Sequence, residues 1–248
     1  MNYKNWIWNQ TNKFDCQLDS LYYYSRIMRI LEDEIFVVNA IADRKGIAID
    51  IGANLGIWSY HLSKLFVQVE AFEPIAGYCD VIRNTRRKNI SIRNEGLSSK
   101  AGNMRLRIPI EDGRLLLQST QSADVSWKFK NKVVPIKTLD EYEFANVKFM
   151  KINVGGHEIE VLKGAKKTII SEKPVMIIEI EQRRLDFPMN NIFELLKSYG
   201  YEAFFLSGRK LRHYTEFSYE VDQLPYLNNL SSIFYVHNFI FWPKDKRS

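Results

Sequence analysis

The feature that most constrains this chain is an apolar run that ends in an acidic residue and two closely spaced glycines. The residues from Ala48 to Gly56 read Ala-Ile-Asp-Ile-Gly-Ala-Asn-Leu-Gly, and a second apolar run ends at Glu73 and Pro74. A helical pattern lies between the two runs. This order predicts a parallel β-α-β unit, in which small residues let backbone N–H groups approach a ligand at the start of the helix.

The two acidic residues indicate which ligand such a unit would hold. A carboxylate at the end of the second strand, here Glu73, can accept hydrogen bonds from both hydroxyls of a ribose. Asp50 would repel a pyrophosphate but attract a sulfonium or an ammonium group. The spacing of Gly52 and Gly56 also lacks the fuller G-x-G-x-x-G pattern of dinucleotide-binding proteins. The sequence therefore favours S-adenosylmethionine, and a nicotinamide-dependent oxidoreductase is the disfavoured alternative.

The composition is that of a soluble globular protein, with 248 residues, 46% of them apolar and 26% charged. No repeat or low-complexity linker divides the chain, so we expect one domain over residues 1–248. It would consist of a helical lead-in over 1–45 and an α/β core over 46–248. Within that core the segment 98–138 looks irregular, as a local hairpin or an insertion over one sheet edge would.

The sequence also indicates the compartment. No apolar run approaches the roughly 20 residues that span a bilayer, and the first residues lack a secretory signal. Cys16 and Cys79 are too far apart in sequence to form a chelating pair and are expected to stay reduced. We therefore expect a cytoplasmic protein without a membrane span.

Strand and helix patterns alternate along the core, which predicts a mostly parallel sheet with helices on both faces. Helical patterns follow Gly56, Pro74 and Gly156 and recur around 192–199, and two more lie in the lead-in, over about 15–32 and 35–42. The expected strands are 47–52, 67–72, 90–96, 147–153, 174–180, 202–206 and 233–241.

The formal net charge is +6, and one acid-free stretch concentrates basic residues. This stretch is either a solvated helix face or a patch for an anionic substrate or a membrane surface. It lacks the interleaved aromatic residues that would favour nucleic acid, so no nucleic-acid partner is expected. The basic residues are Arg83, Arg86, Arg87, Lys88 and Arg93.

Six segments between residues 45 and 182 follow one another in an order and spacing typical of one family. They are Asp50–Gly56, Ala71–Pro74, Asn94–Ser98, Val134–Asp140, Lys151–Ala165 and Pro174–Ile180. Together they resemble the FkbM-type methyltransferases. The resemblance implies a Rossmann-like class I methyltransferase fold, with a seven-stranded, mostly parallel sheet whose last strand is antiparallel. It also implies S-adenosylmethionine as cofactor and methylation of hydroxyl groups on sugars, polyketides and other secondary metabolites.

The resemblance further implies roles for residues at the ends of the first three strands. They are Asp50, Gly52, Ala53 and Asn54 for the methionine end of the cofactor, Glu73 and Pro74 for the ribose, and Asn94, Leu97 and Ser98 for the adenine end. A tight turn without a ligand is the alternative for the glycines. A solvated acid at a strand end is the alternative for Glu73.

The exit of the fourth strand departs from the family pattern. The family usually reads Lys-Ile-Asp-Val-Glu-Gly there, whereas this chain has Asn153 for the Asp and Gly155 for the Glu. A divalent metal prefers anionic oxygen ligands, and Asn153 offers only a neutral carbonyl, so we expect no metal site. Asn153 remains a candidate for a cofactor contact and for catalysis. A second possibility is that the chain binds the cofactor but has lost all or most of its activity.

His157 is the candidate for the residue that accepts a proton. It stands at the expected start of a helix, where the helix dipole disfavours the imidazolium form. Its alternative is an exposed residue of the first turn. Glu179, at the end of the fifth strand, is the candidate for lining the acceptor site, or else it is a buried hydrogen-bond acceptor. The sequence thus predicts an O-methyltransferase that acts on a small-molecule or glycan hydroxyl.

Overall fold

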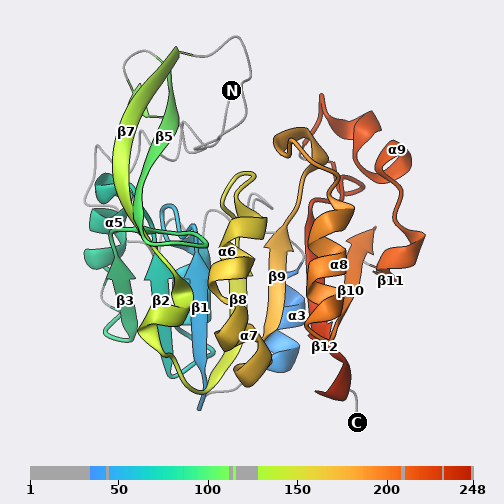
Figure 1. Ribbon diagram of the computed structural model, residues 1–248, viewed down its shortest axis with the longest axis horizontal. Helices are drawn as coiled ribbons and strands as arrows, with labels where there is room; N and C mark the ends of the chain where they lie inside the picture. Colours follow the sequence, from blue (N-terminus) through green and yellow to red (C-terminus); the bar gives the residue numbers. More distant parts are fainter. Residues whose placement is uncertain are drawn as a thin grey trace.

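The computed structural model describes residues 34–42, 45–85, 87–111, 114–115, 128–207, 210–230 and 232–246. Its main sheet has eight strands in the order β11-β10-β12-β9-β8-β1-β2-β3 (Figure 1). The strands are β1 (Ile47–Ile51), β2 (Gln68–Phe72), β3 (Ile90–Arg93), β8 (Val147–Ile152), β9 (Val175–Glu179), β10 (Tyr201–Ser207), β11 (Lys210–His213) and β12 (Asn238–Pro243). The helix expected over 15–32 lies outside the described residues.

The pairing confirms the predicted class of a mostly parallel α/β sheet. Strands β3, β2, β1, β8 and β9 are parallel neighbours, and β12 runs antiparallel to both β9 and β10. Seven of the strands correspond to those expected from the sequence. The eighth, β11, pairs antiparallel with β10 as a hairpin partner at the sheet edge.

Helices cover both faces of the main sheet (Figure 1). On one face, Val161, Leu162 and Ile192 pack against Ile49 and other strand residues in the largest core cluster. On the other face, Val38 and Leu62 pack against strand residues that include Ala48 and Phe149. The first face is covered by α6 (Glu158–Gly164), α7 (Lys166–Glu172) and α8 (Asn190–Ser198), and the second by α3 (Ile35–Ile41) and α4 (Ile57–Leu62).

Strands within residues 96–137, most of which belong to the segment 98–138, form a second sheet in the order β4-β7-β5-β6. Its long strands, β5 (Gly102–Glu111) and β7 (Lys128–Lys137), pair antiparallel and extend away from the main sheet (Figure 1). The short strand β4 (Gly96–Leu97) pairs with Ile136 and Lys137 at the base of β7, and β6 (Arg114–Leu115) pairs with the far end of β5. Both ends of this excursion are thus fixed beside the main sheet.

The register of the parallel strands places their ends at one level. Ile51, the last residue of β1, is the partner of Phe72 in β2 and of Ile152 in β8. Ile152 is in turn the partner of Ile178 in β9. The residues that follow these partners therefore meet at the carboxyl edge of the sheet, where α/β proteins bind their ligands. No helix among the described residues is long and apolar enough to cross a membrane.

Candidate functional site

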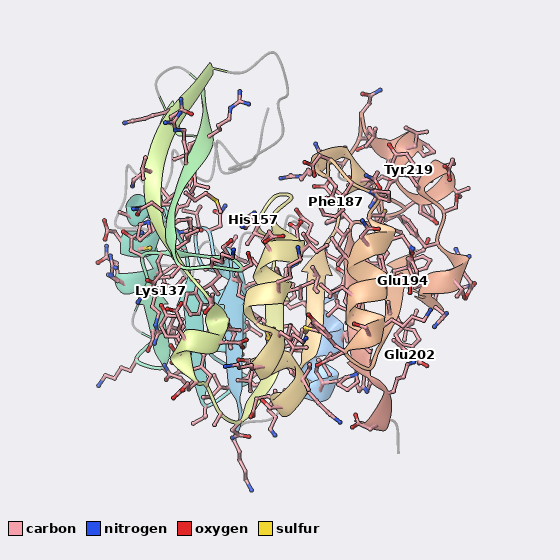
Figure 2. The ribbon with its side chains drawn as sticks, viewed as in Figure 1. Lys137, His157, Phe187, Glu194, Glu202 and Tyr219 are labelled. Carbon is pink, nitrogen blue, oxygen red and sulfur yellow. The ribbon has the colours of Figure 1, made fainter. Side chains whose placement is uncertain are left out.

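Four of the residues singled out from the sequence meet at this carboxyl edge. Gly52, Glu73 and Asn153 each come directly after a strand whose last residues are in register, and Glu179 ends β9. His157 lies at the adjoining end of α6, close to where the β5–β7 ribbon leaves the sheet (Figure 2). The fold thus brings together residues that are more than one hundred positions apart in the chain.

The loop after β1 uses its own backbone donors internally. The N–H groups of Gly52 and Ala53 both donate to the carbonyl of Phe72, each at 3.0 Å, and that of Gly56 donates to Ala53 at 2.8 Å. The next two donors bond to side chains, Asn54 N–H to Glu73 at 2.8 Å and Leu55 N–H to Asn54 Oδ1 at 2.7 Å. Every donor in the loop thus has a partner within the chain.

A close backbone contact explains why glycine stands at position 52. Gly52 has φ of +81°, a left-handed conformation, and a Cβ at this position would lie 1.9 Å from the carbonyl oxygen of Asn153. The Asn153 N–H also donates to the Ile51 carbonyl at 2.9 Å. The loop after β1 and the exit of β8 are therefore packed backbone to backbone.

Glu73 is a buried carboxylate held by two backbone donors. Its oxygens accept hydrogen bonds from Asn54 N–H and Ile75 N–H, both at 2.8 Å, and the side chain is 5% exposed. Burial raises the pKa of the Glu73 carboxyl to about 7, although these two N–H groups favour the ionised form. Each carboxylate oxygen can accept a further hydrogen bond, so the geometry leaves capacity for hydroxyl donors.

Asp50 is buried one strand away and accepts a hydrogen bond from the Ser59 hydroxyl at 2.5 Å. Its charge acts on Glu73, whose pKa it raises. The two carboxylates stand at the ends of neighbouring strands, next to a loop without spare N–H donors. This set suits a ligand that carries a positive charge and hydroxyl groups, and it does not suit a pyrophosphate. The residues therefore fit S-adenosylmethionine better than a dinucleotide.

At the next strand ends, Asn153 and Glu179 are in direct contact. The Asn153 side-chain N–H donates to a Glu179 carboxylate oxygen at 2.9 Å. Below this pair, the buried Lys151 donates to the side-chain carbonyl of Asn238 at 2.7 Å. Glu179 thus places a carboxylate beside Asn153, and position 155 carries none.

The residues expected at the adenine end, Asn94, Leu97 and Ser98, make different kinds of contact. Asn94 donates from its side chain to the Glu73 carbonyl at 3.0 Å, which ties the end of β3 to the end of β2. Leu97 is buried in the main core, so it contributes through packing. Pro74, which follows Glu73, is half-buried.

The Ser98 hydroxyl lies 2.9 Å from His157 Nε2. Burial lowers the pKa of His157 and so favours the neutral imidazole, although Glu160 acts in the opposite direction.

Two glutamates near the site were not assigned a role from the sequence. Glu158 accepts a hydrogen bond from Gly156 N–H at 3.0 Å, and its burial raises the pKa of its carboxyl to about 7. Glu181 is buried too, but ion pairs with Arg184 and Arg183 lower its pKa to about 2. From the sequence alone, a glutamate in the first turn of a helix, such as Glu158, is expected to be solvated. Only the folded structure shows that Glu158 and Glu181 are buried.

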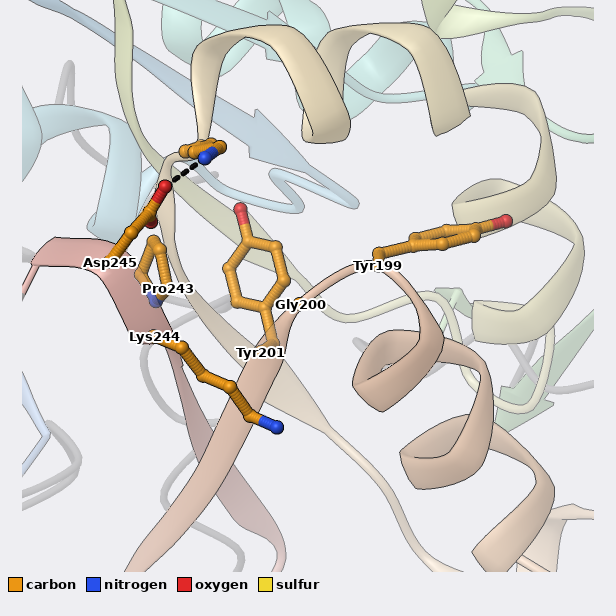
Figure 3. Close-up of a pocket in the computed structure, with 7 residues that line it drawn as sticks. Tyr199, Gly200, Tyr201, Pro243, Lys244 and Asp245 are labelled. Carbon is orange, nitrogen blue, oxygen red and sulfur yellow. Dashed lines mark hydrogen bonds and ion pairs between the residues drawn. The ribbon is translucent and has the colours of Figure 1, made fainter.

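Two further observations concern metal binding and a separate pocket. Within the described residues, no group of three or more His, Cys, Asp or Glu side chains could hold a metal ion. A small pocket lies at the opposite edge of the sheet, where β9 and β10 begin, and includes the Lys173–Asp245 ion pair (Figure 3). It is lined by Lys173, Tyr199, Gly200, Tyr201, Pro243, Lys244 and Asp245 and is separate from the candidate site.

Comparison with known proteins identifies the family. The model of the methyltransferase FkbM domain matches residues 50–203, more than half of the chain. Among solved structures, the chain is similar to the methyltransferase FkbM from Methylobacillus flagellatus KT, with a TM-score of 0.50 and 14% identity over 80% of this chain and 44% of that one. This chain therefore spans less than half the length of that protein.

Two other similar structures are a precorrin-6y C5,15-methyltransferase from Geobacter metallireducens GS-15 and a SAM-dependent methyltransferase from Aquifex aeolicus. The first has a TM-score of 0.45 and 11% identity, covering 84% of this chain and 86% of that one. The second has a TM-score of 0.43 and 13% identity, covering 91% and 95%. At these identities the likeness to solved structures concerns the fold alone. No curated protein matches the chain in sequence.

Proposed function

Because this chain belongs to the FkbM methyltransferase family, we propose that it transfers a methyl group from S-adenosylmethionine to a hydroxyl of a sugar, glycoconjugate or secondary metabolite. The observation that carries the proposal is the placement of Asp50 and Glu73. Two buried carboxylates stand at neighbouring strand ends, beside a loop whose N–H donors are all used within the chain. This arrangement supports binding of a sulfonium and a ribose.

Different residues of the chain would bind different parts of the cofactor. Asp50, with the tight turn through Gly52 to Asn54, would hold the methionine end, and Glu73 would accept the ribose hydroxyls. Asn94 and Ser98 would border the adenine. When bound, the cofactor supplies a methyl group made electrophilic by the sulfonium, and S-adenosylhomocysteine remains after transfer. The protein mainly has to align the acceptor oxygen with that methyl group, and such positioning can lower a barrier by several kcal/mol.

His157 is the proposed proton acceptor for the acceptor hydroxyl. Its Nε2 already lies 2.9 Å from the Ser98 hydroxyl. The proposed role therefore requires the tautomer in which Nε2–H donates to Ser98 Oγ and Nδ1 takes the proton. The neutral imidazole that burial favours is the form that this step needs. Asn153 and Glu179, joined by their hydrogen bond, would orient the acceptor from the neighbouring strand ends.

Calorimetric titration of the purified protein with S-adenosylmethionine and, separately, S-adenosylhomocysteine tests the proposal. Micromolar binding of both is expected, and Glu73→Ala should weaken it. Hydroxylated sugars would then be screened as acceptors, with His157→Ala expected to slow turnover far more than it weakens cofactor binding. Absence of cofactor binding would refute the proposal. Binding without transfer to any hydroxyl would instead support a cofactor-binding homologue that has lost its activity.

A further inference from the structure

The β5–β7 ribbon carries a concentration of positive charge. Its described side chains, over residues 102–108 and 130–137, include five basic residues and no acidic one. Nitrogen-tipped side chains project from both strands where the ribbon extends away from the sheet (Figure 2). We call these five basic residues the basic ribbon. Arg105, Arg107 and Lys137 lie on one face of it, and Lys130 and Lys132 lie on the other face, beside Leu106 and Ile108.

Three of these five basic residues have no acidic partner among the described residues. Lys137 lies 3.5 Å from Glu95, but in the part of the chain that the structure describes Arg105, Lys130 and Lys132 form no ion pair. Arg105 and Lys130 are exposed. Other basic residues, such as Arg83 and Arg93, do pair with acidic residues. An accumulation of unpaired like charge on a projecting element attracts anions and costs stability through self-repulsion, which points to an anionic ligand.

One face of the basic ribbon, along the middle and outer part of β5, adjoins the candidate site. Ile108 is 1% exposed and packs, together with Leu106, against Leu55 in the loop after β1 and against Ile75. The charge of Lys132 acts on the Glu73 carboxyl and lowers its pKa, opposing the effect of burial. A molecule held along the basic ribbon would therefore have one end close to the residues proposed to bind the ribose.

We propose that the basic ribbon binds the anionic groups of the methyl acceptor, and that this acceptor is a sulfated, phosphorylated or carboxylated glycan. The inference rests on the proposed function and narrows its substrate class. Over 102–108 and 130–137 the ribbon has no aromatic residue on which a nucleobase could stack. Val133 is its one large apolar side chain that is strongly exposed among those described, too little to insert into a bilayer. An anionic glycan fits these features better than nucleic acid or a membrane.

The test uses a fluorescein-labelled heparin tetrasaccharide as the sulfated probe and labelled maltotetraose as the neutral one, with binding followed by fluorescence anisotropy. We expect the sulfated probe alone to bind, and more weakly as salt rises. The double variant Arg105→Gln/Lys130→Gln should bind it about tenfold more weakly. The matched control is Lys166→Gln/Lys167→Gln, which removes two exposed charges from α7 and should bind as the native protein does.

Parallel titrations with S-adenosylhomocysteine keep the two proposals separate. The ribbon variant should bind it with native affinity, which also shows that the variant is folded. Equal affinity of the ribbon and control variants for the sulfated probe would overturn the ribbon proposal alone. So would ribbon-dependent binding of single-stranded RNA, or of vesicles containing phosphatidylserine, without binding of the tetrasaccharide. Failure of the native protein to bind S-adenosylhomocysteine would refute the proposed function, whatever the probe does.

Discussion

The side-chain amide of Asn153 donates a hydrogen bond to the Glu179 carboxylate across the ends of the parallel strands β8 and β9. The family pattern has Asp at the position of Asn153, which would set two carboxylates against each other. Here an amide donor meets a single carboxylate. The pair is therefore held by a direct hydrogen bond and needs no bridging cation.

Asn153→Asp tests this relationship. Two adjacent carboxylates disfavour each other's ionised form, so we expect the free energy of unfolding at pH 8 to fall by about 1–3 kcal/mol. The loss should shrink towards pH 5, where one of the pair takes up a proton. Thermal unfolding across this pH range is the measurement. Asn190→Asp is the control, since its side-chain oxygen still accepts from the Tyr214 hydroxyl and the new charge lies in the first turn of α8.

Gly52→Ala should be strongly destabilising. The added methyl group would overlap the Asn153 carbonyl, and the alanine would have to keep a positive φ. We therefore expect the free energy of unfolding, measured by chemical denaturation, to fall by about 3 kcal/mol or more. Gly77→Ala is the matched control within α5 (Ala76–Arg83), because a Cβ there meets nothing within 4 Å. That change should raise stability by up to about 1 kcal/mol. Similar stability of the two variants would contradict the backbone contact.

Cofactor affinity should depend on pH through Glu73. The ionised carboxylate is the form that accepts hydrogen bonds from both ribose hydroxyls, and burial places its pKa at about 7. Ligand binding then favours loss of the proton, so affinity for S-adenosylhomocysteine should fall as pH drops below 7, by up to about tenfold per pH unit. Calorimetry at pH 6, 7 and 8 measures this dependence.

Glu73→Gln should bind the same ligand about tenfold more weakly or worse, with little change across that pH range. A glutamine has one carbonyl oxygen where the N–H groups of Asn54 and Ile75 converge on two carboxylate oxygens. Asp80→Asn is the control, because Asp80 is exposed on α5 and forms an ion pair with Arg83. A native pH profile in Glu73→Gln would exclude Glu73 as the titrating group.

The pKa of His157 should fall further in Glu160→Gln. Burial already lowers it, and the negative charge of Glu160 opposes that effect. Histidine titration by NMR measures the change. Glu194→Gln is a close control, since Glu194 and Lys197 form the same i,i+3 pair on α8 as Glu160 and Lys163 on α6. If both variants shift the His157 titration equally, the effect is one of net charge and not of the local contact.

The sheet was predictable because its central strands are buried on both faces. Runs such as 175–178 are continuously apolar, and acidic residues at or next to the ends of β1, β2 and β9 mark the carboxyl edge. The grouping of Gly52, Glu73 and Asn153 follows from that edge alone. The strand β11 carries no comparable signal, since Lys210 and Leu211 are both exposed.

The contacts within the site could not be predicted in the same way. The use of the Phe72 carbonyl by two N–H groups depends on the register between β1 and β2, which a single sequence leaves open. The contact between Ser98 and His157 joins residues 59 positions apart, through the packing of α6 against β4. Both contacts are consequences of tertiary packing, which local sequence patterns do not reveal.

The ribbon leaves and re-enters the main body between β3 and β8, with its two ends paired to each other through β4 and β7. The ribbon is thus a structurally separate insertion between two strands of the main sheet. Its length and charge can therefore change without moving the strand ends at Asp50, Glu73 and Asn153. Under the proposed role of the basic ribbon, exchanging residues 102–137 is expected to change which acceptor is bound and to leave binding of the methyl donor unchanged.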